Sequence, residues 1–91
     1  MGISFDPAKS ERNERDRGLP FSLVAQFDWS DAVIEEDDRK VYGERRYRVL
    51  GFIGDRLHAV VFTPRAGMVH VISLRKANKR EVKLHEQKAK P

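Results

Sequence analysis

The chain of 91 residues has no cysteine and no long apolar run. Without cysteine it can form neither a disulfide framework nor a thiolate zinc site. No apolar stretch approaches the roughly 18 residues that a membrane span needs, and the opening residues, 1–6, are too short and too polar for a signal peptide. We therefore expect a cytoplasmic protein without membrane association, folded as a single domain over residues 1–91.

Positive charge is concentrated at the C-terminal end of the chain. Residues 75–91 contain seven Lys or Arg and two Glu, whereas residues 1–74 contain eleven basic and twelve acidic residues. The net charge of +4 is therefore local. A basic helix that follows a strand is a suitable place to bind a polyanion, so nucleic acid is the first partner to consider.

The N-terminal part predicts two helices. Asp6 and Pro7 are typical of an N-cap and a first helical residue, and Gly18 is a natural end for this helix. Bases and acids alternate along it, and some of them lie three or four residues apart, so we expect these to form ion pairs. Pro20 is expected to start a second helix, whose buried positions are Phe21, Val24, Ala25 and Phe27 or Trp29.

From residue 32 onward the pattern is typical of strands. We expect strands at residues 32–36, 45–53, 57–63 and 68–74, with a short extra strand at residues 3–5 as an option. The segment 45–53 alternates, which places Tyr47 and Val49 on one face and Arg46 and Arg48 on the other. Gly54-Asp55 predicts a tight turn, and residues 64–67 predict a four-residue turn. A helix is expected directly after Leu74. The fold class is thus α+β, with two N-terminal helices, a four-stranded antiparallel sheet and a C-terminal helix.

A set of short motifs runs along nearly the whole chain in a fixed order. It consists of Phe5-Asp6-Pro7-Ala8-Lys9 with Asn13, Gly18 and Phe21, then Tyr42-Gly43-Glu44 with Arg46, Val61-Phe62-Thr63 with Arg65, and Ile72-Ser73-Leu74-Arg75-Lys76-Ala77 with Arg80-Glu81. At these spacings the chain resembles the BrnT toxins of bacterial toxin–antitoxin pairs. Two positions depart from the usual pattern: Arg17 stands where a histidine is usual, and Leu74 replaces a small residue.

The resemblance implies a RelE-like fold and a ribonuclease that cleaves RNA to inhibit translation and growth. It also implies neutralisation by a BrnA-like antitoxin in a two-plus-two assembly, with operator DNA bound through the antitoxin. Arg17 leaves the role of the usual histidine open. The alternatives are a non-catalytic RNA- or DNA-binding module, an inactive antitoxin-binding relic, and a protein-interaction domain without a nucleic-acid role.

Cleavage of RNA without a metal requires loss of the 2′-OH proton, stabilisation of charge on the phosphate, and protonation of the leaving 5′-oxygen. Arginine suits the second task because it binds phosphate oxygens bidentately and stays charged. Our candidate catalytic residues are Arg65, Arg75 and Arg80. Our candidate RNA-binding residues are Arg17, Arg46, Arg48, Lys76 and Lys79. Glu81 is expected to pair with Arg75 or Lys76, although a role as local cap or as base is open.

The histidines and acids fit simpler interpretations. With an even-numbered turn between their strands, His58 and His70 point to opposite faces of the sheet and cannot form a catalytic pair, which is the simpler interpretation. An odd-numbered turn or a bulge would instead bring them onto one face as diagonal neighbours. His85 is expected to be solvated. The acidic residues between Asp28 and Asp38 match no oxygen-ligand loop, so we expect a solvated edge with no metal and no cofactor. A further interpretation is that this acidic edge attracts a basic patch on a partner.

Overall fold

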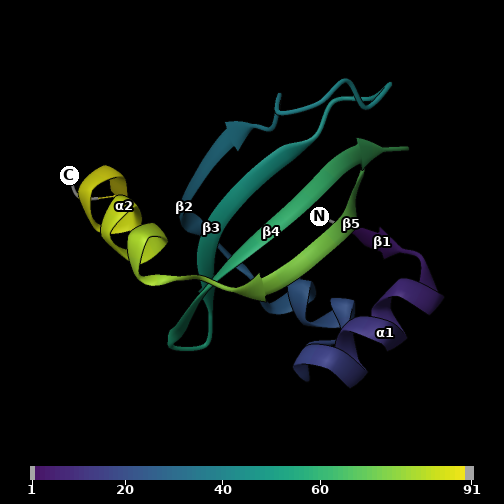
Figure 1. The fold of residues 1–91 in the computed structure, drawn as a ribbon, viewed down its shortest axis with the longest axis horizontal. Coiled ribbons are helices and arrows are strands. Elements are labelled where there is room, and N and C mark those ends of the chain that lie inside the picture. The colour runs from purple at the N-terminus through teal and green to yellow at the C-terminus, as the bar shows by residue number, and fades with distance from the viewer. Residues whose placement is uncertain (1, 90–91) are drawn as a thin grey trace.

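The computed structural model describes residues 2–89 and shows an α+β fold (Figure 1). The elements in chain order are β1 (Ile3–Phe5), α1 (Pro7–Arg17), the 3₁₀ helix η1 (Phe21–Gln26), β2 (Asp28–Glu36), β3 (Tyr47–Ile53), β4 (Arg56–Arg65), β5 (Met68–Lys76) and α2 (Lys79–Ala89). This is the arrangement expected for a RelE-like toxin, and the fold class is confirmed.

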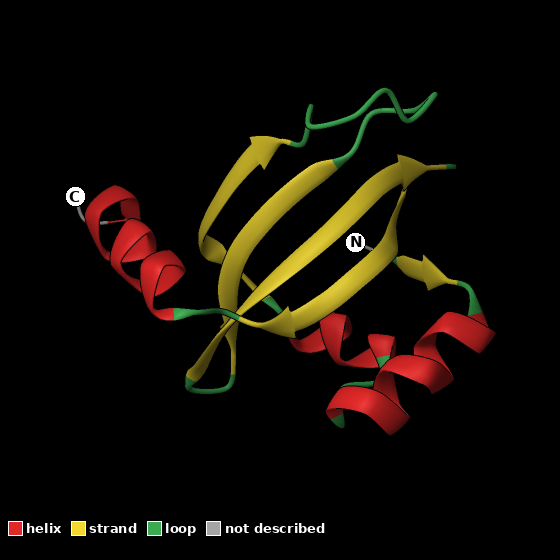
Figure 2. Ribbon diagram, in the orientation of Figure 1, coloured by secondary structure: helices red, strands yellow, loops and turns green. Residues whose placement is uncertain are grey.

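The five strands form one sheet in the order β1-β5-β4-β3-β2 (Figure 2). Strands β2 to β5 form the expected antiparallel meander. The optional strand is present and pairs parallel to β5, with Ile3 opposite Val69. Strands β1 and β2 lie at opposite edges of the sheet. The connection between them, which contains α1 and η1, therefore lies against the sheet, as Figure 1 shows.

Helix α1 begins and ends where its capping residues predict. The carboxylate of Asp6 accepts a hydrogen bond from the backbone N–H of Ala8 at 2.9 Å, and Gly18 adopts φ 72° with its N–H donating to the Glu14 carbonyl. The predicted ion pairs are absent: within residues 2–89, no salt bridge involves a residue of α1. Its charged side chains are exposed to solvent instead.

The second predicted helix is a six-residue 3₁₀ helix, η1. Phe21 and Val24, three residues apart, are buried and match the three-residue repeat of this helix type. Ala25 is exposed, contrary to the prediction, and Trp29 belongs to β2. Phe27 is buried against β3, where a Cβ at Gly51 would collide with the Phe27 ring.

The main core lies between the sheet and the α1–η1 segment. It includes Phe21 and Val24 from η1 together with inward-facing residues of three strands, such as Val49, Val60 and Val71. The other face of the sheet carries a smaller cluster around Leu50 and Leu57, against which Leu84 of α2 packs. Helix α2 therefore covers one end of this second face and leaves the rest of it open.

Two turn predictions have different outcomes. The tight turn at Gly54-Asp55 is confirmed, with Gly54 at φ 64°. The four-residue turn at 64–67 is wrong, because β4 continues to Arg65, which pairs with Met68. Only Ala66 and Gly67 form the turn, at φ 53° and 75°. This conformation suits the twist of a two-residue hairpin.

The start of the C-terminal helix also differs from the prediction. Arg75 and Lys76 continue β5, and α2 begins only at Lys79. His85 is buried rather than solvated: its Nε2–H donates to the Asp31 carbonyl at 3.0 Å, and its ring packs edge-on against Phe52. This contact attaches α2 to the outer strand β2.

Candidate functional site

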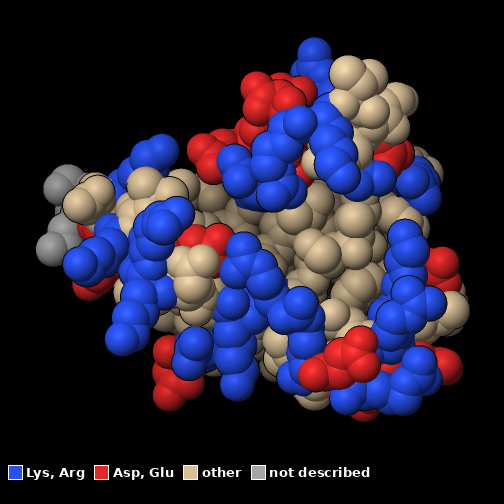
Figure 3. Space-filling view, in the orientation of Figure 1, with Lys and Arg blue, Asp and Glu red and all other residues tan. Residues whose placement is uncertain are grey.

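The open face of the sheet contains a groove of about 340 Å³. Small and apolar side chains of β3 and β4, including Leu50, Ala59 and Val61, form part of its lining. Residues of α2 line one side of the groove, and Arg39 of the loop after β2 also lines it. In Figure 3 this face has an uncharged centre bordered by Lys and Arg side chains.

Four arginines and two glutamates line the groove. They are Arg39, Arg48, Arg75, Arg80, Glu35 and Glu81. Three of the arginines were candidates from the sequence, and the fold brings these three together from β3, β5 and α2. The balance of charge favours an anionic ligand.

Arg75 is held by a bidentate ion pair. Its two terminal nitrogens donate to the two carboxylate oxygens of Glu81 at 2.7 and 2.8 Å, which confirms the expected pairing. Glu81 also accepts from the N–H of Asn78, while the side chain of Asn78 accepts from the N–H of Glu81. This reciprocal arrangement caps the start of α2. The hydrogen bonds from Arg75 lower the pKa of Glu81, so this carboxylate stays ionised.

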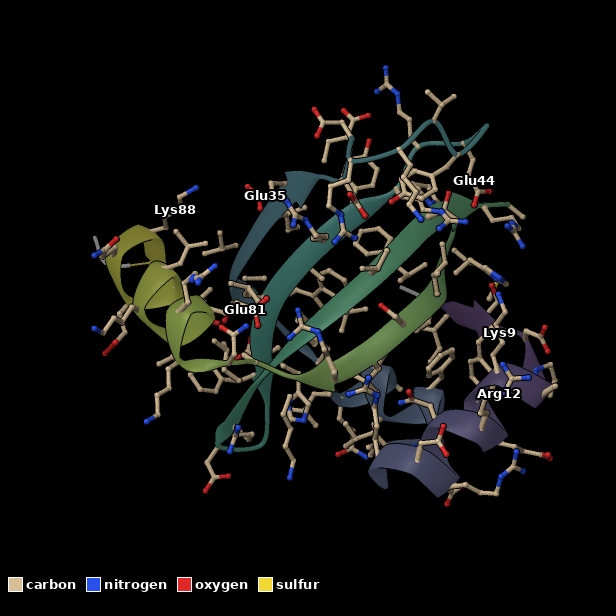
Figure 4. The ribbon with its side chains drawn as sticks, in the orientation of Figure 1. Lys9, Arg12, Glu35, Glu44, Glu81 and Lys88 are labelled. Carbon is tan, nitrogen blue, oxygen red and sulfur yellow. The ribbon has the colours of Figure 1, made fainter. Side chains whose placement is uncertain are left out.

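Arg80 lies at the second position of α2 and is exposed. It makes no ion pair with any residue in the 2–89 range. Its guanidinium is therefore available to an anion in the groove, whereas Arg75 is fixed in place by Glu81, which Figure 4 labels on α2.

Arg48 of β3 lies opposite Glu35 of β2, and their side chains form an ion pair at 3.0 Å. The Nε of Arg48 is buried and has no hydrogen-bond partner within residues 2–89. Arg48 therefore has an unused donor beside the groove floor.

Arg39 was not among the candidates. Its guanidinium donates at 2.7 and 2.8 Å to the two carboxylate oxygens of Asp37. Asp37 is buried, with only 3% of its surface exposed. This pair holds the pKa of Asp37 well below its usual range. The acidic segment is thus not wholly a solvated edge, since Asp37 anchors the loop that carries Arg39. The adjacent acids and bases in residues 37–40 were the only sequence signal for this pair.

Arg65 belongs to a second polar cluster at the far end of the same face. It donates to Nε2 of His70 at 3.0 Å and to Glu44 at 3.2 Å. Arg46 also pairs with Glu44, at 3.3 Å. Because Arg75 pairs with Ala59 and Arg65 lies six residues further along β4, the two arginines are separated by about 20 Å. One phosphate cannot contact both.

The contact with Arg65 defines the state of His70. Because arginine can only donate, Nε2 of His70 accepts and its Nδ1–H donates to the Ser4 hydroxyl at 2.8 Å. Burial and the charge of Arg65 lower the pKa of His70 and favour this neutral form. His58 lies on the opposite face, buried among core residues, so the expectation that the two histidines form no pair is confirmed.

The remaining candidates lie outside the groove. Arg17, at the end of α1, lines a separate hollow beside β5. Lys76, the last residue of β5, and Lys79, the first of α2, are both exposed. Arg46 lies over the ring of Tyr42, 4.1 Å from its centre.

Within residues 2–89, no group of three or more His, Cys, Asp or Glu side chains is placed to hold a metal ion. In the same residues no helix is long and apolar enough to cross a membrane.

Comparison with known families identifies the chain. A sequence model of the ribonuclease toxin BrnT, of type II toxin–antitoxin systems, matches residues 5–81. The chain belongs to the BrnT family. The matched segment contains Arg65, Arg75 and Arg80 and ends at Glu81, the partner of Arg75. No curated protein and no solved structure matches the chain. As a type II toxin, the protein has RNA as its substrate and a cognate antitoxin as its partner.

Proposed function

We propose that this BrnT toxin cleaves RNA without a metal, in the groove between the sheet and α2. The observation that carries the proposal is the convergence of Arg48, Arg75 and Arg80 on one groove with an uncharged floor. In such a site the 2′-oxygen attacks the adjacent phosphate, the 5′-oxygen leaves, and a 2′,3′-cyclic phosphate forms. Arg75 and Arg80 stabilise the additional negative charge that the phosphate oxygens carry in the transition state.

Proton transfer is the slow part of this mechanism. Arginine holds its proton too tightly to act as a base at neutral pH, and the pKa of Glu81 is lowered by Arg75. A carboxylate with a lowered pKa is a weak base. The site therefore relies on positioning and on charge stabilisation, which predicts slow turnover.

The Arg65–His70 cluster is a second candidate location for the chemistry. A neutral imidazole at 3.0 Å from a guanidinium combines a group that can accept a proton with one that binds phosphate. Against this location, the contacts of His70 with Ser4 and Arg65 occupy both ring nitrogens. We therefore assign the reaction to the groove and assign Arg65 to a neighbouring part of the RNA.

We further propose that the antitoxin is a BrnA-like dimer that covers the open face, in an assembly of two toxins and two antitoxins that binds operator DNA through the antitoxin. The exposed acids of β2 beside the groove, among them Asp31, Glu35 and Glu36, support this proposal because they would attract a basic segment of the antitoxin.

The test is cleavage of a mixed-sequence RNA by the purified protein in the presence of a chelator. Arg75→Ala and Arg80→Ala are compared with Lys83→Ala, which removes an exposed cation of α2 that does not line the groove. We expect cyclic phosphate products from the wild type and from Lys83→Ala, and losses of about 100-fold in the other two.

Three results would contradict the proposal. Activity that requires an added divalent cation would exclude the metal-independent mechanism. Equal activity of Arg80→Ala and Lys83→Ala would exclude the groove. RNA that is bound but never cut would identify a binding module or an inactive relic.

A further inference from the structure

A second hollow of about 290 Å³ lies between α1 and β5. It is lined by Lys9, Arg12, Asn13, Asp16, Arg17, Phe21, Ile72 and Ser73. The five lining residues of α1 follow one another at spacings of three, one, three and one, so they share one face of the helix. Figure 4 shows Lys9 and Arg12 on α1, across the sheet from Glu81 on α2.

The cations of this hollow have no partner of opposite charge. Lys9, Arg12 and Arg17 make no ion pair with any other described residue, and Asp16 is the only acid that lines the hollow. The hollow therefore carries an excess of positive charge that nothing within residues 2–89 neutralises.

A bulge in β5 connects this hollow to the groove. The pairing of β4 with β5 shifts between Val61 and Phe62, so that Val71 and Leu74 are both buried in the core with two residues between them. Ile72 and Ser73 are thereby both left away from the core. Ser73 lines the groove as well as the second hollow, so the two meet at this residue.

Asn13, which lines the second hollow, holds α1 against β5. Its side-chain amide donates to the Leu74 carbonyl at 3.0 Å and to the Leu19 carbonyl at 2.7 Å. These bonds attach the middle of α1 to β5 and to the segment after the helix. The backbone of α1 is thus fixed relative to β5, which favours binding because less backbone freedom is lost.

We propose that the second hollow binds the backbone of single-stranded RNA next to the cleaved phosphate, with the strand passing over Ser73 from one hollow to the other. The inference rests on the proposed function of the groove. A single strand fits the lining, because the part-exposed Ile72 offers an apolar contact to an unpaired base while Lys9, Arg12 and Arg17 contact phosphates. The toxin then requires a substrate that extends past the cleavage site in one direction.

The test measures the affinity of the full-length protein for two non-cleavable 2′-O-methyl RNAs, a dinucleotide and a strand of about ten nucleotides. Arg12→Ala is compared with Arg15→Ala, which removes an exposed arginine of the same helix that does not line the hollow. For the long RNA we expect Arg12→Ala to weaken binding about three- to tenfold and to reduce the salt dependence by about 0.7 in the log–log slope. Arg15→Ala should change neither quantity, and the dinucleotide should bind equally to the wild type, to Arg12→Ala and to Arg15→Ala.

The inference would be overturned if Arg12→Ala and Arg15→Ala had equal effects on binding of the long RNA. It would also be overturned if Arg12→Ala weakened binding of the dinucleotide as much as binding of the long RNA. Arg80→Ala separates the two proposals. If Arg80→Ala weakens both RNAs and Arg12→Ala weakens neither, the groove remains the substrate site and only the second hollow is excluded. If Arg80→Ala has no effect on either RNA, the groove is excluded, and the path across Ser73 is excluded with it.

Discussion

Each end of the open sheet face presents an arginine, but the two arginines have different partners. At the α2 end, Arg75 is paired bidentately with Glu81, and both groups keep their charge across the neutral pH range. At the far end, Arg65 lies between the carboxylate of Glu44 and a neutral His70. One end thus provides fixed charge in a groove, and the other provides an arginine beside a neutral histidine whose two ring nitrogens are both hydrogen-bonded. The arginines of this face are therefore not equivalent, and we expect the two ends to respond differently to mutation and to pH.

The largest expected effect separates the two ends by activity. Arg80→Ala should reduce single-turnover RNA cleavage about 100-fold, because it removes a donor to the transition state. Arg65→Ala should reduce it less than about tenfold, since its phosphate contact would lie outside the reacting group. The reverse order would place the chemistry beside His70.

The second prediction concerns stability at the α2 end. Glu81→Gln weakens the pair with Arg75 and the cap of α2, and should lower the free energy of unfolding by about 1–3 kcal/mol. Glu86→Gln, at an exposed position of the same helix, should change it by less than about 0.5 kcal/mol. Urea unfolding at pH 7 measures both. Equal values would mean that the Arg75–Glu81 pair does not stabilise the junction of β5 and α2.

The local signals of the sequence predicted much of the fold. Asp6-Pro7 and Gly18 delimited α1 because caps depend on adjacent residues, and the alternation in β3 assigned Arg48 to the open face. Gly54-Asp55 located the β3–β4 turn for the same reason. These features require only a few neighbouring residues, so a single sequence is sufficient to find them.

Features that depend on distant contacts were not predictable. The burial of His85 requires α2 to fold back onto β2, and the bulge at Ile72 is defined only by pairing with β4. The role of Asp37 depends on how its loop closes around Arg39. The arginines of the candidate site were visible as residue types, but their separation into two ends about 20 Å apart follows from strand register, which the sequence alone does not reveal.

The third prediction concerns how the free energy of unfolding depends on pH through His70, at the far end of the open face. Burial and the charge of Arg65 lower the pKa of His70, with a smaller contribution from Lys9, while Glu44 and Asp6 oppose the shift. The unfolded chain therefore binds a proton more readily than the folded protein, and this group's contribution to stability decreases as pH falls below about 6.5. His70→Gln should flatten the stability curve between pH 7 and pH 5, as measured by urea unfolding.

A matched control for this pH dependence is His58, on the other face of the sheet. Burial also lowers its pKa, so it contributes a slope of the same sign. His70→Gln should therefore leave a residual slope, and it should leave the pH dependence of cleavage unchanged if the reaction takes place in the groove. A cleavage rate that loses its pH dependence in His70→Gln would assign the proton transfer to the far end.

The smallest expected effect tests whether α1 contacts RNA in addition to the two ends of the open face. Arg17 stands where the resembled sequences usually carry a histidine, and it lines the second hollow. At pH 7.5, Arg17→His replaces a fixed cation by a mostly neutral ring, so affinity for a long RNA should fall about twofold and should recover near pH 6, where the imidazole is protonated. Arg15→His, outside the hollow, should show neither change. The cleavage rate of bound RNA should be the same in all three proteins, because Arg17 contacts RNA beyond the reacting phosphate. A rate that increases in Arg17→His would instead mean that the end of α1 reaches the reaction centre. A histidine at this position would then supply the proton transfer that neither the Arg75 end nor the Arg65 end of the open face provides.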